Sequence, residues 1–178
     1  MAKGRLEKGF IQVYTGDGKG KTTCALGLAL RAAGQGLQVY MIQFLKGRET
    51  GEAQAAARLA PEMTLQYFGR PGLVNLKSPA PEDLTLVREA WDLAKKVLAA
   101  GEHDLVILDE INLVLTYNLI PLDEALEVLR LRPPHVELVL TGRQAPEELV
   151  DLADLVTEMR PVKHYYQAGV KSRRGIEW

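Results

Sequence analysis

The nine residues T-G-D-G-K-G-K-T-T, from Thr15 to Thr23, lie between a short β-rich run, 10–14, and an Ala/Leu-rich run that begins at Lys21. The three glycines of this stretch allow a strand-to-helix turn in which successive backbone N–H groups point inward. Those groups and the first turn of the helix together form a cradle for phosphate oxygens. The spacing therefore predicts a phosphate-binding loop, in which Lys21 reaches the phosphates and the Thr22 hydroxyl ligates Mg²⁺.

One position departs from the usual form of this motif. The motif normally begins with a glycine, separated by four residues from the glycine before the lysine. Thr15 holds that first place here. The alternative interpretation is a glycine-rich turn with an incidental Lys-Thr pair, which the placement between a strand and a helix disfavours.

A second motif, from Leu105 to Glu110, is an apolar run that ends in two acidic residues. A continuous apolar run is typical of a strand that is buried on both faces. A carboxylate at the end of such a strand lies near the phosphate loop and can hold Mg²⁺ directly or through water. Asp109 and Glu110 are therefore candidate metal ligands together with Thr22. The alternative is that the two acids only cap the end of a strand.

Strand-like and helical runs alternate along the chain. We expect strands at 10–14, 39–44, 65–68, 105–108, 136–140 and 155–159, and helices at 21–33, 49–59, 81–100, 122–131 and 146–152. This alternation predicts one α/β domain over residues 1–178. We expect a P-loop NTPase-like fold with a mostly parallel sheet of about five or six strands and helices on both faces.

Composition narrows the classes of protein that remain. A length of 178 residues fits one domain, and 22 Lys+Arg against 23 Asp+Glu disfavour a nucleic-acid-binding protein. The single cysteine, Cys24, can form neither an internal disulfide nor a thiolate metal site. The charged start, 1–8, is not followed by an apolar segment, and no run of about 18 apolar residues follows anywhere. We therefore expect a cytoplasmic protein with no membrane partner.

Further blocks of sequence are more specific than the phosphate loop. They read QFLKG (43–47), LDEIN (108–112), TGR (141–143), LADLVTEMRPVKH (152–164), AGVK (168–171) and GIE (175–177). With the phosphate loop, these blocks resemble the P-loop family of ATP:corrinoid adenosyltransferases, also called cob(I)yrinic acid a,c-diamide adenosyltransferases. The resemblance covers nearly the whole chain, and generic P-loop proteins lack its last blocks.

The resemblance implies a reaction. The Co(I) of a reduced corrinoid, cobalamin or cob(I)yrinic acid a,c-diamide, attacks the 5′ carbon of ATP, the adenosyl group moves to cobalt and triphosphate leaves. Cobalt is itself the nucleophile, and the protein has to stabilise the charge of the leaving group. The resemblance also implies Mg²⁺ with ATP, a flavoprotein reductant, a homodimer and a role in adenosylcobalamin biosynthesis or salvage.

The resemblance further assigns roles to individual residues. Glu110 corresponds to an acid associated with Mg²⁺, and Arg31 and Arg143 correspond to arginines near the nucleotide. Lys21, Arg143 and Glu110 are the candidate catalytic residues. From the residues alone, Arg31 would be a solvated helix residue, whereas Arg143 follows a strand end, where open α/β sheets bind ligands. The nucleotide-binding positions of the loop are Gly16, Asp17, Gly18, Lys19, Gly20, Lys21, Thr22 and Thr23.

Two segments bear on the corrinoid. In the family, aromatic side chains in the loop after the third strand pack against the lower face of the corrinoid. The corresponding stretch here, 67–73, offers Phe68, which could equally be a core residue at a strand end, while Leu73 could supply an apolar contact. The basic and aromatic tail, 163–174, closes over the nucleotide, meets the edge of the corrinoid, or is solvated.

Three other classes fit the two nucleotide motifs alone. An ATPase or recombinase-like motor would use Glu110 to position water, but the chain is small and lacks a basic stripe for nucleic acid. A nucleoside kinase of the thymidine type would carry a cysteine zinc cluster, which one cysteine forbids. A non-enzymatic corrinoid carrier or nucleotide sensor would turn nothing over. The products distinguish these classes. Adenosyl transfer releases triphosphate, a motor releases single phosphate, a kinase leaves ADP, and a carrier or sensor releases no product.

Overall fold

The computed structural model describes residues 5–177, so that residues 1–4 of the charged start and Trp178 lie outside the described part. Six strands form one sheet in the order β3-β2-β4-β5-β1-β6, and every neighbouring pair is parallel. The strands are β1 Ile11–Thr15, β2 Val39–Phe44, β3 Met63–Phe68, β4 Leu105–Asp109, β5 Glu137–Thr141 and β6 Leu155–Glu158. The predicted parallel α/β sheet is confirmed.

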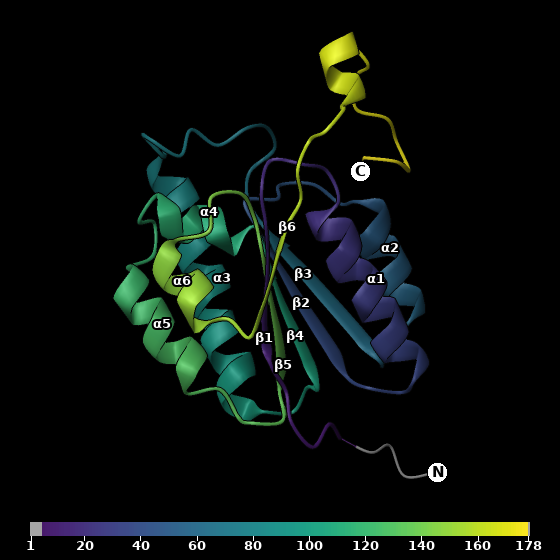
Figure 1. The fold of residues 1–178 in the computed structure, drawn as a ribbon, viewed down its shortest axis with the longest axis vertical. Coiled ribbons are helices and arrows are strands. Elements are labelled where there is room, and N and C mark those ends of the chain that lie inside the picture. The colour runs from purple at the N-terminus through teal and green to yellow at the C-terminus, as the bar shows by residue number, and fades with distance from the viewer. Residues whose placement is uncertain (1–4, 178) are drawn as a thin grey trace.

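Helices cover both faces of this sheet (Figure 1), with α1 and α2 on one face and α3 to α6 on the other. The helices are α1 Lys21–Gly34, α2 Gly51–Arg58, α3 Pro81–Ala100, α4 Ile111–Thr116, α5 Leu122–Arg130 and α6 Glu147–Leu152, followed by the 3-10 helix η1 Tyr165–Ala168. Helix α4 and η1 are not among the predicted elements. Both are short, so they carry little periodic signal. No helix of residues 5–177 is long and apolar enough to cross a membrane.

The two faces of the sheet bury separate hydrophobic clusters. In β4, Val106 and Leu108 face the cluster under α3 to α6, while Leu105 and Ile107 face the cluster under α1. This explains why β4 reads as a continuous apolar run, because successive side chains point to opposite faces and both faces are covered. The α1 side uses small residues, and Ala25 and Ala29 are completely buried. The helix can therefore approach the sheet closely.

Parallel pairing places the ends of the strands along one edge. The neighbouring strands β2, β4, β5 and β1 end at the same edge of the sheet. Tyr14 of β1 pairs with Thr141 of β5, and Gln43 of β2 pairs with Asp109 of β4. The phosphate loop follows β1, and the acidic pair ends β4. The fold thus brings together motifs that lie almost ninety residues apart in the chain, about the separation of Thr22 and Asp109.

Removing a side chain from the core should cost far more than removing one from the surface. Leu138 in β5 is completely buried, whereas Leu131 after α5 is 76% exposed. We expect Leu138→Ala to lower the free energy of unfolding by about 2–5 kcal/mol, because it leaves a cavity between packed layers. Leu131→Ala, the matched control, should change it by less than about 0.5 kcal/mol. Urea denaturation measures both, and equal losses would contradict the packing described.

Candidate nucleotide-binding site

The phosphate loop between β1 and α1 is packed against the segment that follows β6. The N–H of Gly18 donates to the carbonyl of Met159 at 2.6 Å. A Cβ atom added at Gly16 or at Gly18 would lie 2.5 or 2.6 Å from that same oxygen, and Gly16 also has a φ of +90°. Only glycine fits such an approach without a shift. The start of the C-terminal segment therefore supports the loop from behind.

Lys21 is tied into the loop that precedes it. Its ammonium donates to the carbonyl of Gly16 at 2.6 Å and to that of Gly18 at 2.8 Å. The residue is only 8% exposed. Burial lowers the pKa of this ammonium from its usual value, and the charge of Glu110 opposes that shift. The lysine thus lies at the floor of the loop, held by two neutral oxygens that phosphate oxygens can replace.

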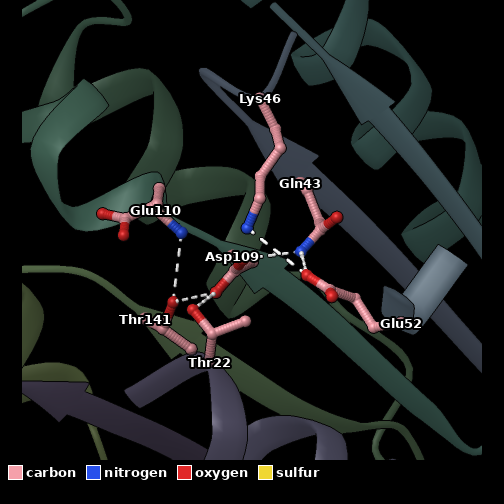
Figure 2. Close-up of polar contacts among 7 residues, drawn as sticks. All are labelled: Thr22, Gln43, Lys46, Glu52, Asp109, Glu110 and Thr141. Atoms are coloured by element: carbon pink, nitrogen blue, oxygen red, sulfur yellow. Dashed lines mark hydrogen bonds and ion pairs between the residues drawn. The ribbon is translucent and has the colours of Figure 1, made fainter. Parts of the chain in front are cut away.

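Asp109 ends β4 with a completely buried carboxylate that three side chains contact (Figure 2). Oδ1 accepts from the hydroxyl of Thr22 at 2.8 Å and from that of Thr141 at 2.6 Å. Oδ2 accepts from Nε2 of Gln43 at 3.0 Å. These partners come from α1, β5 and β2, so one carboxylate holds the first turn of α1 against three strands.

The side chain of Glu110 points away from this network, as Figure 2 shows. Its φ is +64°, in the left-handed region, and its N–H donates to the hydroxyl of Thr141 at 3.0 Å. Burial raises the pKa of its carboxyl group, and the charge of Asp109 adds to the effect. Its Oε2 atom is buried without a hydrogen-bond partner in the described structure. A buried acceptor of this kind is costly unless a ligand completes it.

These residues surround a cavity of about 570 Å³ at the carboxyl edge of the sheet. Arg143, in the loop after β5, lies on its rim with Nε 3.8 Å from Oδ1 of Asp17. Lys46 and Glu52 line it from the side of β2 and α2. The C-terminal segment lines it through His164 and 175–177. The cavity therefore joins the phosphate loop to the tail block that generic P-loop proteins lack.

The oxygen atoms at the floor fit Mg²⁺. Hydroxyl and carboxylate oxygens are its preferred ligands, and it is usually held by one or two carboxylates together with substrate phosphates. The hydroxyl of Thr22 and the unpartnered carboxylate of Glu110 provide such oxygens in the cavity lining, whereas the oxygens of Asp109 are taken by Thr22, Gln43 and Thr141. Within residues 5–177, no group of three or more His, Cys, Asp or Glu side chains is placed to hold a metal ion. The donor set suits an ion that shares its shell with a nucleotide.

Most of the predicted site residues come together here. Gly16 and Asp109 lie just behind the wall, where the carbonyl of Gly16 holds Lys21 and Asp109 holds Thr22. The predicted residues that line the cavity are Asp17, Gly18, Lys19, Gly20, Lys21, Thr22, Thr23, Glu110 and Arg143.

Arg31 is not brought to this cavity. It lies in the last turn of α1 and lines a separate cavity of about 300 Å³ with Leu6 and Leu28. Ten residues of helix separate it from Lys21, a distance of about 15 Å along the axis. The placement beside the nucleotide that the resemblance implied is therefore not found within this chain.

Phe68, which the resemblance places against the corrinoid, does not line this nucleotide cavity. It is half-buried at the end of β3 and packs against the core cluster on the α3 side. Its partner across the ladder is Phe44. Side chains alternate between the two faces along β3, and Phe68 points to the face that α3 covers. Of the neighbouring side chains, Leu73 in the following loop is fully exposed.

Four residues of the site received no role from the sequence. Gln43, Lys46 and Thr141 lie within the blocks 43–47 and 141–143, and Glu52 comes from the first turn of α2. Gln43 and Thr141 are polar residues at the ends of otherwise buried strands, which is a usable signal for a site at a sheet edge. Nothing in the sequence around Glu52 marks it.

The parallel sheet, the phosphate loop and the acid-ended β4 define a P-loop nucleotide-binding protein. A structural comparison agrees on the fold alone: "KaiC-like protein PH0186" from Pyrococcus horikoshii OT3 superimposes with a TM-score of 0.54 at 16% identity, covering 86% of this chain and 74% of that one.

The family model of "ATP:corrinoid adenosyltransferase BtuR/CobO/CobP" matches residues 7–178, so the chain belongs to that family. The corrinoid adenosyltransferase of Escherichia coli (strain K12) is 38% identical over 179 residues, covering 100% of this chain and 90% of the relative. That of Pseudomonas aeruginosa is 35% identical over 178 residues, covering 100% and 88%. The resemblance inferred from the sequence blocks is thereby confirmed.

The role of Thr141 can be tested by replacing its hydroxyl with a methyl group. Thr141→Val leaves Asp109 Oδ1 with one partner fewer and removes the acceptor of the Glu110 N–H. We expect a loss of about 1–3 kcal/mol in the free energy of unfolding, because buried groups lose their hydrogen bonds. In the control, Thr157→Val on the exposed strand β6, the change should stay within about 0.5 kcal/mol. Denaturant unfolding measures both variants. An unchanged free energy of unfolding in Thr141→Val would show that the hydrogen bonds around Asp109 do not stabilise the protein.

Proposed function

We propose that this chain transfers the 5′-deoxyadenosyl group of ATP to the Co(I) of a corrinoid, cobalamin or cob(I)yrinic acid a,c-diamide, and releases triphosphate. The observation that carries the proposal is the convergence of the phosphate loop and the family-specific tail block on one cavity. The membership of residues 7–178 in the ATP:corrinoid adenosyltransferase family supports it.

In this reaction no side chain of the protein forms a covalent bond to the substrate. The electron pair of Co(I) forms the bond to C5′ of ATP, and the bond between C5′ and the α-phosphate oxygen breaks. That oxygen leaves with the bonding pair as part of triphosphate. What the protein supplies is stabilisation of the charge that gathers on the leaving group.

The described residues suit that task. The backbone N–H groups of the loop, the ammonium of Lys21 and the guanidinium of Arg143 lie around one cavity. Lys21 can exchange its two carbonyl partners for phosphate oxygens, because hydrogen bonds between charged groups are stronger than those to neutral carbonyls. Arg143 is exposed on the rim of the cavity, where its guanidinium can approach the triphosphate of ATP.

Asp109 is not suited to activate a nucleophile. Both of its oxygens are occupied, and it has no access to solvent. We assign it the role of holding Thr22 and the floor of the loop. Mg²⁺ would be held by the hydroxyl of Thr22 and the carboxylate of Glu110, which both line the cavity, while Asp109 acts on it through Thr22. When bound, the ion supplies positive charge to the phosphates. A flavoprotein reductant, a homodimer, a cytoplasmic location and a place in adenosylcobalamin biosynthesis or salvage remain part of the proposal through the family.

An anaerobic assay tests this function directly. The protein is mixed with Mg²⁺, ATP and chemically reduced cob(I)alamin, visible spectra are followed and phosphates are resolved by ³¹P NMR. The proposal requires a light-sensitive alkyl-cobalt product formed in step with triphosphate. ADP and phosphate with an unchanged corrinoid would indicate an ATPase and reject the transferase.

Removing the ammonium of Lys21 should remove most of the activity. We expect Lys21→Ala to lower turnover by about 100-fold or more, since one preorganised donor for developing charge contributes on that order. Lys95→Ala is the control, because Lys95 on α3 is not part of the cavity lining and lies 2.8 Å from Asp92 and 3.7 Å from Glu124. Its turnover should equal that of the unsubstituted protein. A folded Lys21→Ala variant with normal turnover would refute the role of Lys21.

A further inference from the structure

The QFLKG block, 43–47, holds the backbone of Lys46 in one place. Leu45 has a φ of +59°, a conformation that a leucine adopts only when its surroundings impose it. The N–H of Lys46 donates to the carbonyl of Phe68 at 3.0 Å. A Cβ atom added at Gly47 would lie 1.9 Å from the carbonyl oxygen of Arg70. The loops after β2 and β3 are thus packed backbone to backbone, and Lys46 is positioned by both.

The side chain of Lys46 extends from this fixed backbone into the wall of the nucleotide cavity. Its ammonium lies 3.4 Å from Oε1 of Glu52. Figure 2 draws this contact between the two side chains. That distance is long for a charge-assisted hydrogen bond, which is about 2.7–2.9 Å. The Lys46 side chain retains 27% of its exposure, against 16% for that of Glu52. The ammonium is therefore loosely held and can still turn toward the cavity.

Glu52 is the more buried of the two side chains and has a second partner. Nε2 of Gln43 lies 3.3 Å from its Oε1 and also donates to Asp109 at 3.0 Å. Burial alone would raise the pKa of the Glu52 carboxyl, but hydrogen bonds and the charge of Lys46 outweigh burial and lower it. The cavity wall thus carries an ionised carboxylate, which repels phosphate unless Lys46 lies between them.

We propose that Lys46 is a further ligand of the triphosphate chain, and that Glu52 holds its ammonium at the cavity wall until the nucleotide binds. This rests on the proposed function, because ATP brings the triphosphate. Lysine suits an exchange of partners, since its ammonium is a point charge with three donors on a flexible stem. Glu52 is a positioning residue that acts through Lys46 and does not touch the phosphates.

The test is calorimetric titration with inorganic tripolyphosphate in the presence of Mg²⁺, at one fixed salt concentration. Lys46→Met should weaken binding about tenfold, the effect of losing one charged hydrogen bond. Lys46→Arg, which keeps the charge, should stay within about threefold. Glu52→Gln should tighten binding about threefold, because it releases Lys46 and removes a negative charge. Opposite signs for the two partners are a result that a merely structural ion pair would not produce.

Controls matched in charge come from the surface pair on α3. Lys95→Met and Asp92→Asn change the net charge in the same way, 2.8 Å apart and outside the cavity lining. Both should leave the affinity for tripolyphosphate unchanged. Thermal unfolding of each variant confirms that it is folded, which is expected for the partly exposed Lys46.

Three outcomes would overturn the proposal. If Lys46→Met binds tripolyphosphate as the unsubstituted protein does while Lys21→Ala does not, Lys46 is no ligand, and the proposed function stands. If Glu52→Gln weakens binding as much as Lys46→Met, the pair is structural and the holding role is wrong. If the unsubstituted protein binds neither ATP nor tripolyphosphate, the proposed function fails together with this inference.

Discussion

The buried carboxylate of Asp109 is the contact on which the site depends. It accepts from Thr22, Gln43 and Thr141, and therefore ties the first turn of α1 to β2, β4 and β5. A buried charge without partners would be strongly destabilising, so the three donors and the carboxylate require one another. The phosphate loop enters α1 one residue before Thr22, so its position relative to the sheet follows from this contact.

A second constraint acts on the loop from the other side. Met159, just after β6, approaches Gly16 and Gly18 so closely that no side chain fits there. The segment that follows Met159 then continues to the far wall of the cavity, where His164 and residues 175–177 lie. The edge strand β6 thus has two effects. It supports the phosphate loop, and it carries the tail to the same cavity.

Both signs of charge line this cavity. The loop contributes Lys21 and Asp17, with Arg143 beside Asp17, and the strand and helix ends contribute Glu110, Lys46 and Glu52. Strained backbone accompanies three of these positions, because positive φ values occur at Leu45, Glu110 and Gln144, each at or next to a cavity residue. Such strain persists only where the surrounding packing imposes it. It marks the ends of β2, β4 and β5 as the parts that position charged side chains.

The sequence by itself determined the parallel α/β fold, the phosphate loop and the acidic end of β4, because these follow from local patterns: apolar runs, glycine spacing and strand–helix alternation. It also determined the family, through blocks such as 152–164 that have no generic equivalent. Only the tertiary structure decided that Gln43, Glu52 and Thr141 join the site, since their contacts depend on which strands are neighbours. It likewise separated Arg31 and Phe68 from the cavity. A residue's match to a family motif does not say how far along α1 it lies from the loop, or to which face of the sheet a β3 side chain points.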